Sequence, residues 1–232
     1  LVTNHSFPIM GEFIKENHYE NFVDLVQYDV PITAQILNRY KNFNERVSKN
    51  LKIKTVEFTS TKAVKPYVKP VFDLINKTYT EIYGFTKLTE DEMTEFAERF
   101  LPLLNTTLIK MITDENGQLL AFIIAMADLS EAIKNSRGRI LPFGWARILW
   151  AMKTSKRLQL LLGAIHPNYQ NKGLDAVLAT MLFGSALKLG FKTVDSHLIM
   201  KDNLKMRGEI EKLEGFNLYK EYCIFRKNLV VG

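Results

Sequence analysis

Four polar residues, Gln170 to Gly173, separate an apolar run from an amphipathic pattern in this 232-residue sequence. The run Leu158 to Ile165 has the length of a buried strand, and Pro167 ends it because proline lacks a backbone donor. After Gly173, apolar residues recur at three- and four-residue steps, which predicts a helix over 174–189. A helix that starts there presents unpaired N–H groups and partial positive charge. The stretch therefore predicts an anion site, to which Lys172 adds a charge.

Two histidines stand where a general base could act. His166 and His197 come at the ends of neighbouring predicted strands, and Asp195 could orient His197. The alternative is that each histidine is structural or merely exposed. No metal-ligand spacing is found among four histidines and one cysteine, and the sequence has no P-loop, dinucleotide-binding glycine motif or serine elbow.

Basic residues are concentrated in one part of the chain, whose net charge is +6. No acidic residue occurs from Ala132 to Leu174, whereas eight lysines and arginines do. Such a block could receive the phosphates of coenzyme A, an acidic substrate, nucleic acid or an anionic membrane, or could be a solvated surface. Nucleic acid is the least favoured partner because no recognised binding module accompanies the charge.

The segment Phe143 to Trp150 is strongly apolar, with two tryptophans and an arginine. It could be a buried helix that closes a cleft, the wall of an apolar acyl or acceptor site, a membrane-contacting surface or a homodimer contact.

Composition is typical of a globular protein, with 47% apolar and 24% charged residues. The single Cys223 cannot form an internal disulfide and suits a reducing cytoplasm, where we place the protein. No apolar run reaches the length of a membrane span, and no secretory signal pattern occurs.

The remaining pattern predicts the order of elements that must position these residues. A strand is expected over 52–58, a long helix over 64–83, a helix over 89–101 with a capping box, and a β-hairpin over 106–127. After the central strand and helix come a strand over 193–199, a helix over 203–213 and a strand over 218–226. The order predicts an α/β fold with a mixed, mostly antiparallel sheet flanked by helices.

The motif Gln170-x-x-Gly173, preceded by a strand and followed by a helix, resembles the pyrophosphate loop of the GNAT superfamily of acyl-CoA-dependent N-acyltransferases. Asn203 and the pair Gly215-Phe216 match a second mark of that superfamily. The resemblance covers residues 52–228. It implies acetyl-CoA or another acyl-CoA as co-substrate, without a metal, and direct attack on the thioester by the amine of a small molecule or peptide. The cofactor-binding residues it implies are Ala164, Ile165, His166, Gln170, Asn171, Lys172, Gly173, Leu174, Asp175 and Asn203.

The chain departs from that superfamily at two positions. Asp175 stands where the motif has a second glycine or alanine, and its carboxylate would repel a phosphate. Glu211 stands where many members have a tyrosine that acts as the acid, and could serve only with a raised pKa. His197 and Glu211 are therefore the predicted catalytic residues. The departures keep open a degenerate, non-catalytic binding or scaffold domain, and the Phe143–Trp150 segment keeps open a membrane-surface acyltransferase.

Residues 1–30 show a faint repeat of the other end of the chain. Residues 10–15 parallel residues 207–212, with Gly11 and Gly208 in register. This predicts that residues 1–30 are the tail of a preceding GNAT-like repeat, or an appendage, and that the chain is the C-terminal half of a tandem protein. Residues 31–51 are polar with a helical tendency and are expected to be a connector, and residues 52–228 are expected to be the GNAT-like domain. The first residue, Leu1, led to the expectation that the chain is a fragment.

Overall fold

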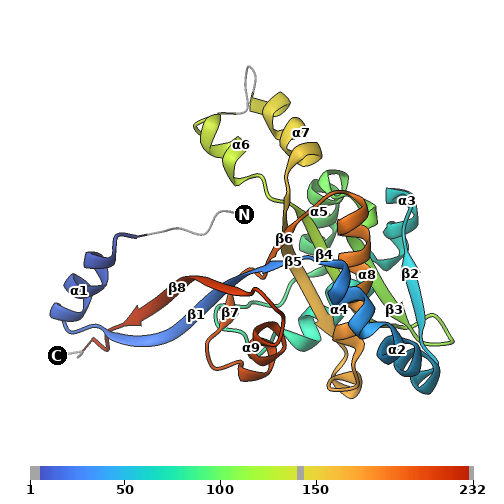
Figure 1. Ribbon diagram of the computed structural model, residues 1–232. Helices are drawn as coiled ribbons and strands as arrows, with labels where there is room; N and C mark the ends of the chain where they lie inside the picture. The colour runs from blue at the N-terminus through green and yellow to red at the C-terminus, as the bar shows by residue number, and fades with distance from the viewer. Residues whose placement is uncertain (1–5, 140–143, 230–232) are drawn as a thin grey trace. The chain divides into compact units, whose positions relative to one another are not determined.

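The structure is a computed structural model that describes residues 6–139 and 144–229 (Figure 1). The chain divides into two compact units. The larger unit comprises residues 32–127 and 155–194, and the smaller comprises residues 1–31, 128–154 and 195–232. Each unit is described by itself.

The larger unit is an antiparallel sheet between two layers of helices. Its strands follow the order β2 (Lys54–Glu57), β3 (Ile109–Thr113), β4 (Leu119–Ala127) and β5 (Arg157–Ile165), after which the order continues with β6 (Thr193–Asp195). Neighbours from β2 to β5 pair antiparallel. Its helices are α2 (Ala34–Leu51), α3 (Thr61–Val64), α4 (Val68–Thr78), α5 (Glu90–Phe100) and α8 (Leu174–Lys188).

Alternation along the strands gives the sheet an apolar core on each face. On one face, Met111 and Phe122 pack with residues of α4, including Val71 and Ile75. On the other face, Ile112 packs with residues of α2 and α8. The second core fixes α8, and with it the loop that precedes α8, against the sheet.

A β-bulge interrupts the pairing of β4 with β5. Ile124 pairs with Leu162 and Ala125 with Leu160, so Leu161 has no partner on β4. Such a bulge bends a strand and redirects its main-chain groups. The bend lies just before the part of β5 that leads to the predicted anion site.

The smaller unit contains an antiparallel ribbon of two long strands, β1 and β8, with the short strand β7. β1 (Glu20–Pro31) pairs antiparallel with β7 (Ile199–Met200) and with β8 (Asn217–Arg226). Its helices are α1 (Pro8–Glu16), α6 (Ser130–Asn135), α7 (Gly144–Thr154) and α9 (Leu204–Glu211).

The segments α1–β1 and α9–β8 have the same order, a helix, a turn and a strand. In each turn one residue is left-handed, His18 with φ 63° and Gly215 with φ 79°. The two residues are separated by the same interval as Gly11 and Gly208. The interpretation of residues 1–30 as the tail of a preceding repeat stays a prediction.

The fold class is confirmed. The segment over 31–51, expected to be a polar connector with a helical tendency, is largely helix α2, which packs on α8. Two other elements differ from expectation. The helix expected over 64–83 is divided into α3, a 3₁₀ turn at Lys65–Tyr67 and α4, because Pro66 and Pro70 lack backbone donors. The strand expected over 193–199 is interrupted between β6 and β7, where His197 is left-handed with φ 60°.

Candidate functional site

The loop between β5 and α8 has the geometry of an anion site. Asn171 and Gly173 are left-handed, with φ 64° and 85°, and α8 begins at Leu174. Gly173 is the residue that caps the helix and has no side chain to accept from its first turn. The first N–H groups of α8 therefore lack the usual cap and, by helix geometry, an intrahelical partner. This arrangement suits the oxygens of a phosphate.

Glycine at position 173 also satisfies a packing requirement. A Cβ added there would lie 2.8 Å from Phe43 Cε1 and 3.0 Å from Val47 Cγ2, both on α2. Because φ of Gly173 is positive, replacing it with any other residue would also strain the backbone. Gly173 thus has a structural role besides the predicted one in ligand binding.

The end of β5 offers main-chain groups that do not pair with another strand. The hydroxyl of Tyr79, just after α4, donates to the Gly163 carbonyl at 2.9 Å and accepts from the Gly163 N–H at 3.3 Å. Gln170 Nε2 donates to the Ile165 carbonyl at 3.3 Å. Gly163 and Ile165 are two residues apart, so their main-chain groups point to the same side of the strand. An extended ligand lying along β5 would use these groups.

Burial raises the pKa of Tyr79, although the hydrogen bond to Gly163 opposes this shift. The hydroxyl therefore stays protonated at neutral pH and remains both a donor and an acceptor. It donates to the carbonyl of Gly163 and accepts from its N–H, as the amide of a bound ligand would.

His166 follows β5 directly. Its Nε2 lies 2.8 Å from Lys77 Nζ, and burial followed by the Lys77 charge lowers its pKa. His166 is therefore neutral at physiological pH. The ring of Tyr169 lies edge-on to His166 and carries the Lys172 ammonium above it at 5.2 Å. Two lysines thus line the loop, and the exposed Asp175 stands in the first turn of α8.

A hydrogen-bond network surrounds Asp195 in the smaller unit. Its carboxylate is buried and accepts from Gln27 Nε2 at 2.6 Å, from the Tyr219 hydroxyl at 2.7 Å and from the backbone N–H of His197 at 2.9 Å. Asp195 thus holds the main chain of His197, whereas the sequence led us to expect a role in orienting this histidine. Left-handed backbone in a non-glycine residue is often associated with functional sites.

Burial lowers the pKa of His197, and the Asp195 charge opposes this shift. Neutral His197 therefore stabilises the fold above about pH 6.5, and this contribution is lost as the pH falls from there through the lower pKa of the folded state. We expect His197→Gln to make the free energy of unfolding less dependent on pH below about 6.5. Urea unfolding at a series of pH values measures this, and an unchanged slope would contradict it.

Glu211 lies in a network that keeps it ionised. It accepts from the Tyr28 hydroxyl and pairs with Arg207 at 3.2 Å, and these contacts, that of Tyr28 most strongly, lower its pKa. A general acid at this position needs the opposite shift. Asn203 caps α9 by accepting from the Met206 N–H at 3.1 Å, which gives it a structural role.

The predicted site residues fall into two groups. Residues Ala164 to Asp175 come together in the larger unit, on β5, the loop and the start of α8. His197, Asn203 and Glu211 belong to the smaller unit. Sequence reasoning missed the role of Tyr79, which falls within the helix expected over 64–83. The signal that could have found it is that a buried tyrosine hydroxyl requires a partner.

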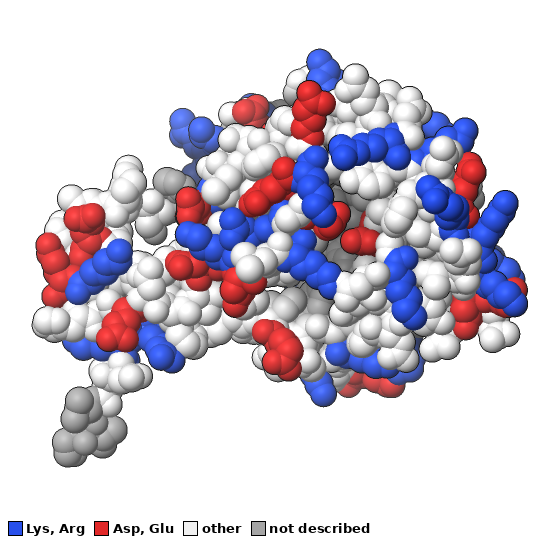
Figure 2. Space-filling view, turned by 60° about the horizontal axis from the view of Figure 1, so that its bottom comes forward, with Lys and Arg blue, Asp and Glu red and all other residues white. Residues whose placement is uncertain are grey.

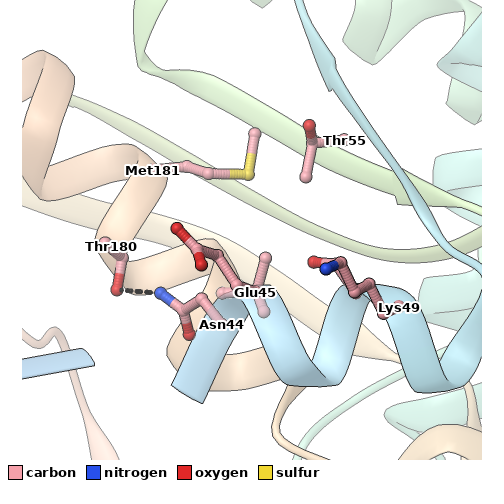
Figure 3. Close-up of a pocket in the computed structure, with 8 residues that line it drawn as sticks. Asn44, Glu45, Lys49, Thr55, Thr180 and Met181 are labelled. Carbon is pink, nitrogen blue, oxygen red and sulfur yellow. Dashed lines mark hydrogen bonds between the residues drawn. The ribbon is translucent and has the colours of Figure 1, made fainter. Parts of the chain in front are cut away.

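A pocket of about 600 Å³ lies beside the middle of α8. Figure 3 shows Asn44, Glu45 and Lys49 of α2 facing Thr55 of β2 and Met181 of α8. Asn44 Nδ2 donates to Thr180 Oγ1 at 2.8 Å. The residues of the predicted anion loop do not line this pocket, so it is separate from the candidate site.

The described residues contain neither a metal-binding cluster nor a helix able to cross a membrane. Outside the gaps at 1–5, 140–143 and 230–232, no cluster of histidine, cysteine or acidic side chains suits a metal ion. Over the same residues, no helix combines the length and apolar character needed to cross a membrane. On the face in Figure 2, described basic and acidic side chains are interspersed, without the continuous basic strip expected of a nucleic-acid surface.

Solved structures identify the fold. The chain is similar to a GCN5-related N-acetyltransferase from Sphaerobacter thermophilus, with a TM-score of 0.57 and 10% identity over 96% of this chain and 56% of that one. It is also similar to a tandem GNAT protein from the clavulanic acid biosynthesis pathway, with a TM-score of 0.55 and 12% identity over 96% of this chain and 59% of that one. At these identities the likeness shows the fold, and this chain has the fold of the GNAT superfamily.

Two curated proteins are similar in sequence. A bacterial ceramide synthase of Caulobacter vibrioides is 23% identical over 242 residues, covering 99% of this chain and 60% of that protein. Protein YghO of Escherichia coli is 24% identical over 233 residues, covering 97% of this chain and 58% of that protein. The chain thus spans about three-fifths of the length of these relatives. No family model matches the chain.

Proposed function

We propose that this chain transfers an acyl group from an acyl-CoA to a primary amine. The observation that carries the proposal is the combination of main-chain groups at the end of β5, which are bonded to the side chains of Tyr79 and Gln170, with the uncapped start of α8. The first suits the amides of an extended pantetheine arm, and the second suits a pyrophosphate.

The protein would mainly need to position the two substrates, because the reaction requires no covalent intermediate with the protein. The unprotonated amine attacks the thioester carbonyl, the C–N bond forms, the C–S bond breaks, and the thiolate leaves and takes up a proton. Lys172 and the first turn of α8 would hold the phosphates, and Gly163 and Ile165 would align the arm. His197 as base stays a prediction, as do a cytoplasmic location and a homodimer.

For the acceptor, we propose an amine-bearing lipid. The support is the relative named bacterial ceramide synthase, which aligns with 99% of this chain. A ceramide is an N-acylated long-chain amine, so its synthesis is the same amide-forming reaction. Acetyl-CoA, expected from the sequence, and a longer acyl-CoA remain the two candidate donors.

Acyl-CoA binding should respond in opposite directions to two substitutions in the loop. Lys172→Glu replaces a cation beside the phosphates and should weaken binding about tenfold, whereas Asp175→Asn removes a repelling charge and should strengthen it a few-fold. Calorimetric titration with acetyl-CoA and palmitoyl-CoA measures both. Mass spectrometry of mixtures with a long-chain amine then detects the amide product.

Three outcomes separate the alternatives. Absence of binding at millimolar acyl-CoA would overturn the proposal. Binding without transfer to any amine would favour a non-catalytic binding domain, which the ionised state of Glu211 also favours. If the two substitutions changed acyl-CoA affinity by the same factor and in the same direction, or left it unchanged, the phosphates would bind elsewhere.

Tyr79→Phe should strengthen acyl-CoA binding about fivefold, because the ligand then need not displace the hydroxyl from Gly163. The same change should lower the free energy of unfolding by about 1 kcal/mol. Tyr83→Phe, on a half-exposed side chain nearby, is the control and should leave affinity unchanged. Weaker binding by Tyr79→Phe would instead show that the hydroxyl contacts the ligand.

A further inference from the structure

Helices α6 and α7 form a hairpin with its own contacts (Figure 1). Arg147 Nη1 of α7 donates to the Asn135 carbonyl at the end of α6, at 2.6 Å. Ala132 of α6 is buried, as is Gly144 at the start of α7. The packing leaves one stripe of α7 in contact with solvent.

That stripe is apolar and contains large side chains. Trp145 and Leu149 are each 52% exposed and Trp150 is 69% exposed. Together with Ala146 they occupy positions i, i+1, i+4 and i+5, which are neighbours on a helix surface. Ile133 of α6 adds a side chain that is 38% exposed. An exposed apolar stripe of this kind marks a contact surface.

The charge around the stripe favours an anionic partner. All the basic residues of the hairpin described by the structure are exposed, namely Lys134, Arg137, Arg139, Arg147 and Lys153. From Ala132 onward the hairpin has no acidic residue, and Glu131 is the acidic residue of α6. A second copy of this chain would set basic residues against basic residues. Lipid phosphates complement them, and tryptophan and arginine favour the water–lipid boundary.

We propose that α7 docks in the surface of an anionic lipid bilayer, with Trp145, Leu149 and Trp150 entering the interface. Its 11 residues extend about 16 Å, roughly half the thickness of a bilayer's hydrocarbon core, so the helix lies in the surface plane. The inference goes beyond acyl transfer and depends on no ligand of the β5–α8 loop.

Tryptophan fluorescence tests this surface directly, because Trp145 and Trp150 are the two tryptophans of the chain. We expect the emission of the full 232-residue chain to shift to shorter wavelength with vesicles of phosphatidylcholine and phosphatidylglycerol, and not with phosphatidylcholine alone. Added salt should weaken the effect. The double variant Leu149→Ser/Trp150→Ser should reduce the partition coefficient, measured by vesicle flotation, about tenfold or more.

Leu204→Ser is the matched control, since Leu204 is 72% exposed on α9 and should not affect flotation. Circular dichroism establishes that each variant is folded. The proposal is overturned if the chain does not float with anionic vesicles at low salt, or if the double variant floats as well as the parent. Light scattering that shows a dimer dissociated by the double variant, without flotation of the parent, would assign the stripe to self-association instead.

Discussion

Gly173→Ala is expected to lower the free energy of unfolding by about 2–3 kcal/mol, whereas Gly84→Ala should lower it by about 1 kcal/mol. Both glycines are left-handed, with φ 85° and 77°. An added Cβ at Gly84 meets no atom within 4 Å, but at Gly173 it meets Phe43 and Val47. The difference between the variants therefore measures the packing of α2 on the loop, separately from backbone strain.

Urea unfolding of the two variants measures this difference. Phe43→Ala provides space for the new methyl group, so Gly173→Ala should cost less in the Phe43→Ala background than in the parent. Equal costs for Gly173→Ala and Gly84→Ala would show that α2 does not press on the loop. If α2 does not press on the loop, a loss of acyl-CoA binding in a folded Gly173→Ala variant would be caused by a change in the loop itself and not by a displaced α2.

Glu57→Gln should destabilise the protein by about 2–3 kcal/mol, while Lys110→Met should change stability by less than about 1 kcal/mol. The Lys110 side chain is 1% exposed, donates to Ser185 Oγ at 2.7 Å and pairs with Glu57. Removing the carboxylate leaves a buried ammonium without its counter-charge. Methionine removes the charge and fills a similar volume. Because Glu57 is 60% exposed, the expected loss is below that of a fully buried pair.

Glu209→Gln is the control for loss of a surface ion pair. Its partner Lys212 lies at 2.7 Å, and both side chains are about half exposed or more, so the change should cost under about 1 kcal/mol. A Lys110→Met variant that is more destabilised than Glu57→Gln would contradict this expectation, since the ammonium would then contribute net stability.

Elements with a local signal were predictable from the sequence. The β-hairpin over 106–127, with its turn at Asp114–Gly117, and the capping box of Thr89 and Glu92 fall where expected. Each of these features is determined by residues that are close in the sequence, so the local sequence pattern is sufficient to predict it. The apolar stripe of α8 was also predicted, apart from Leu189, which is 42% exposed, and Phe183, which is buried.

Features that depend on distant residues were not predictable. The buried residues of α2 are Ile36 and Val47, which is too sparse a pattern to identify a packed helix. His197 adopts a left-handed backbone that its residue type does not signal, because buried Asp195 holds its N–H. The Tyr79–Gly163 contact joins residues 84 apart, and periodicity contains no information about such a pair.

The Tyr79 hydroxyl on Gly163 has a consequence for selectivity. Binding along β5 is an exchange, in which a ligand gains only the difference between its own hydrogen bonds and those of the tyrosine. A ligand that offers a donor and an acceptor at amide spacing replaces both bonds. A nucleotide without a pantetheine arm, or a plain hydrocarbon chain, replaces neither. We therefore expect the resting hydroxyl to discriminate against such ligands before any chemistry occurs.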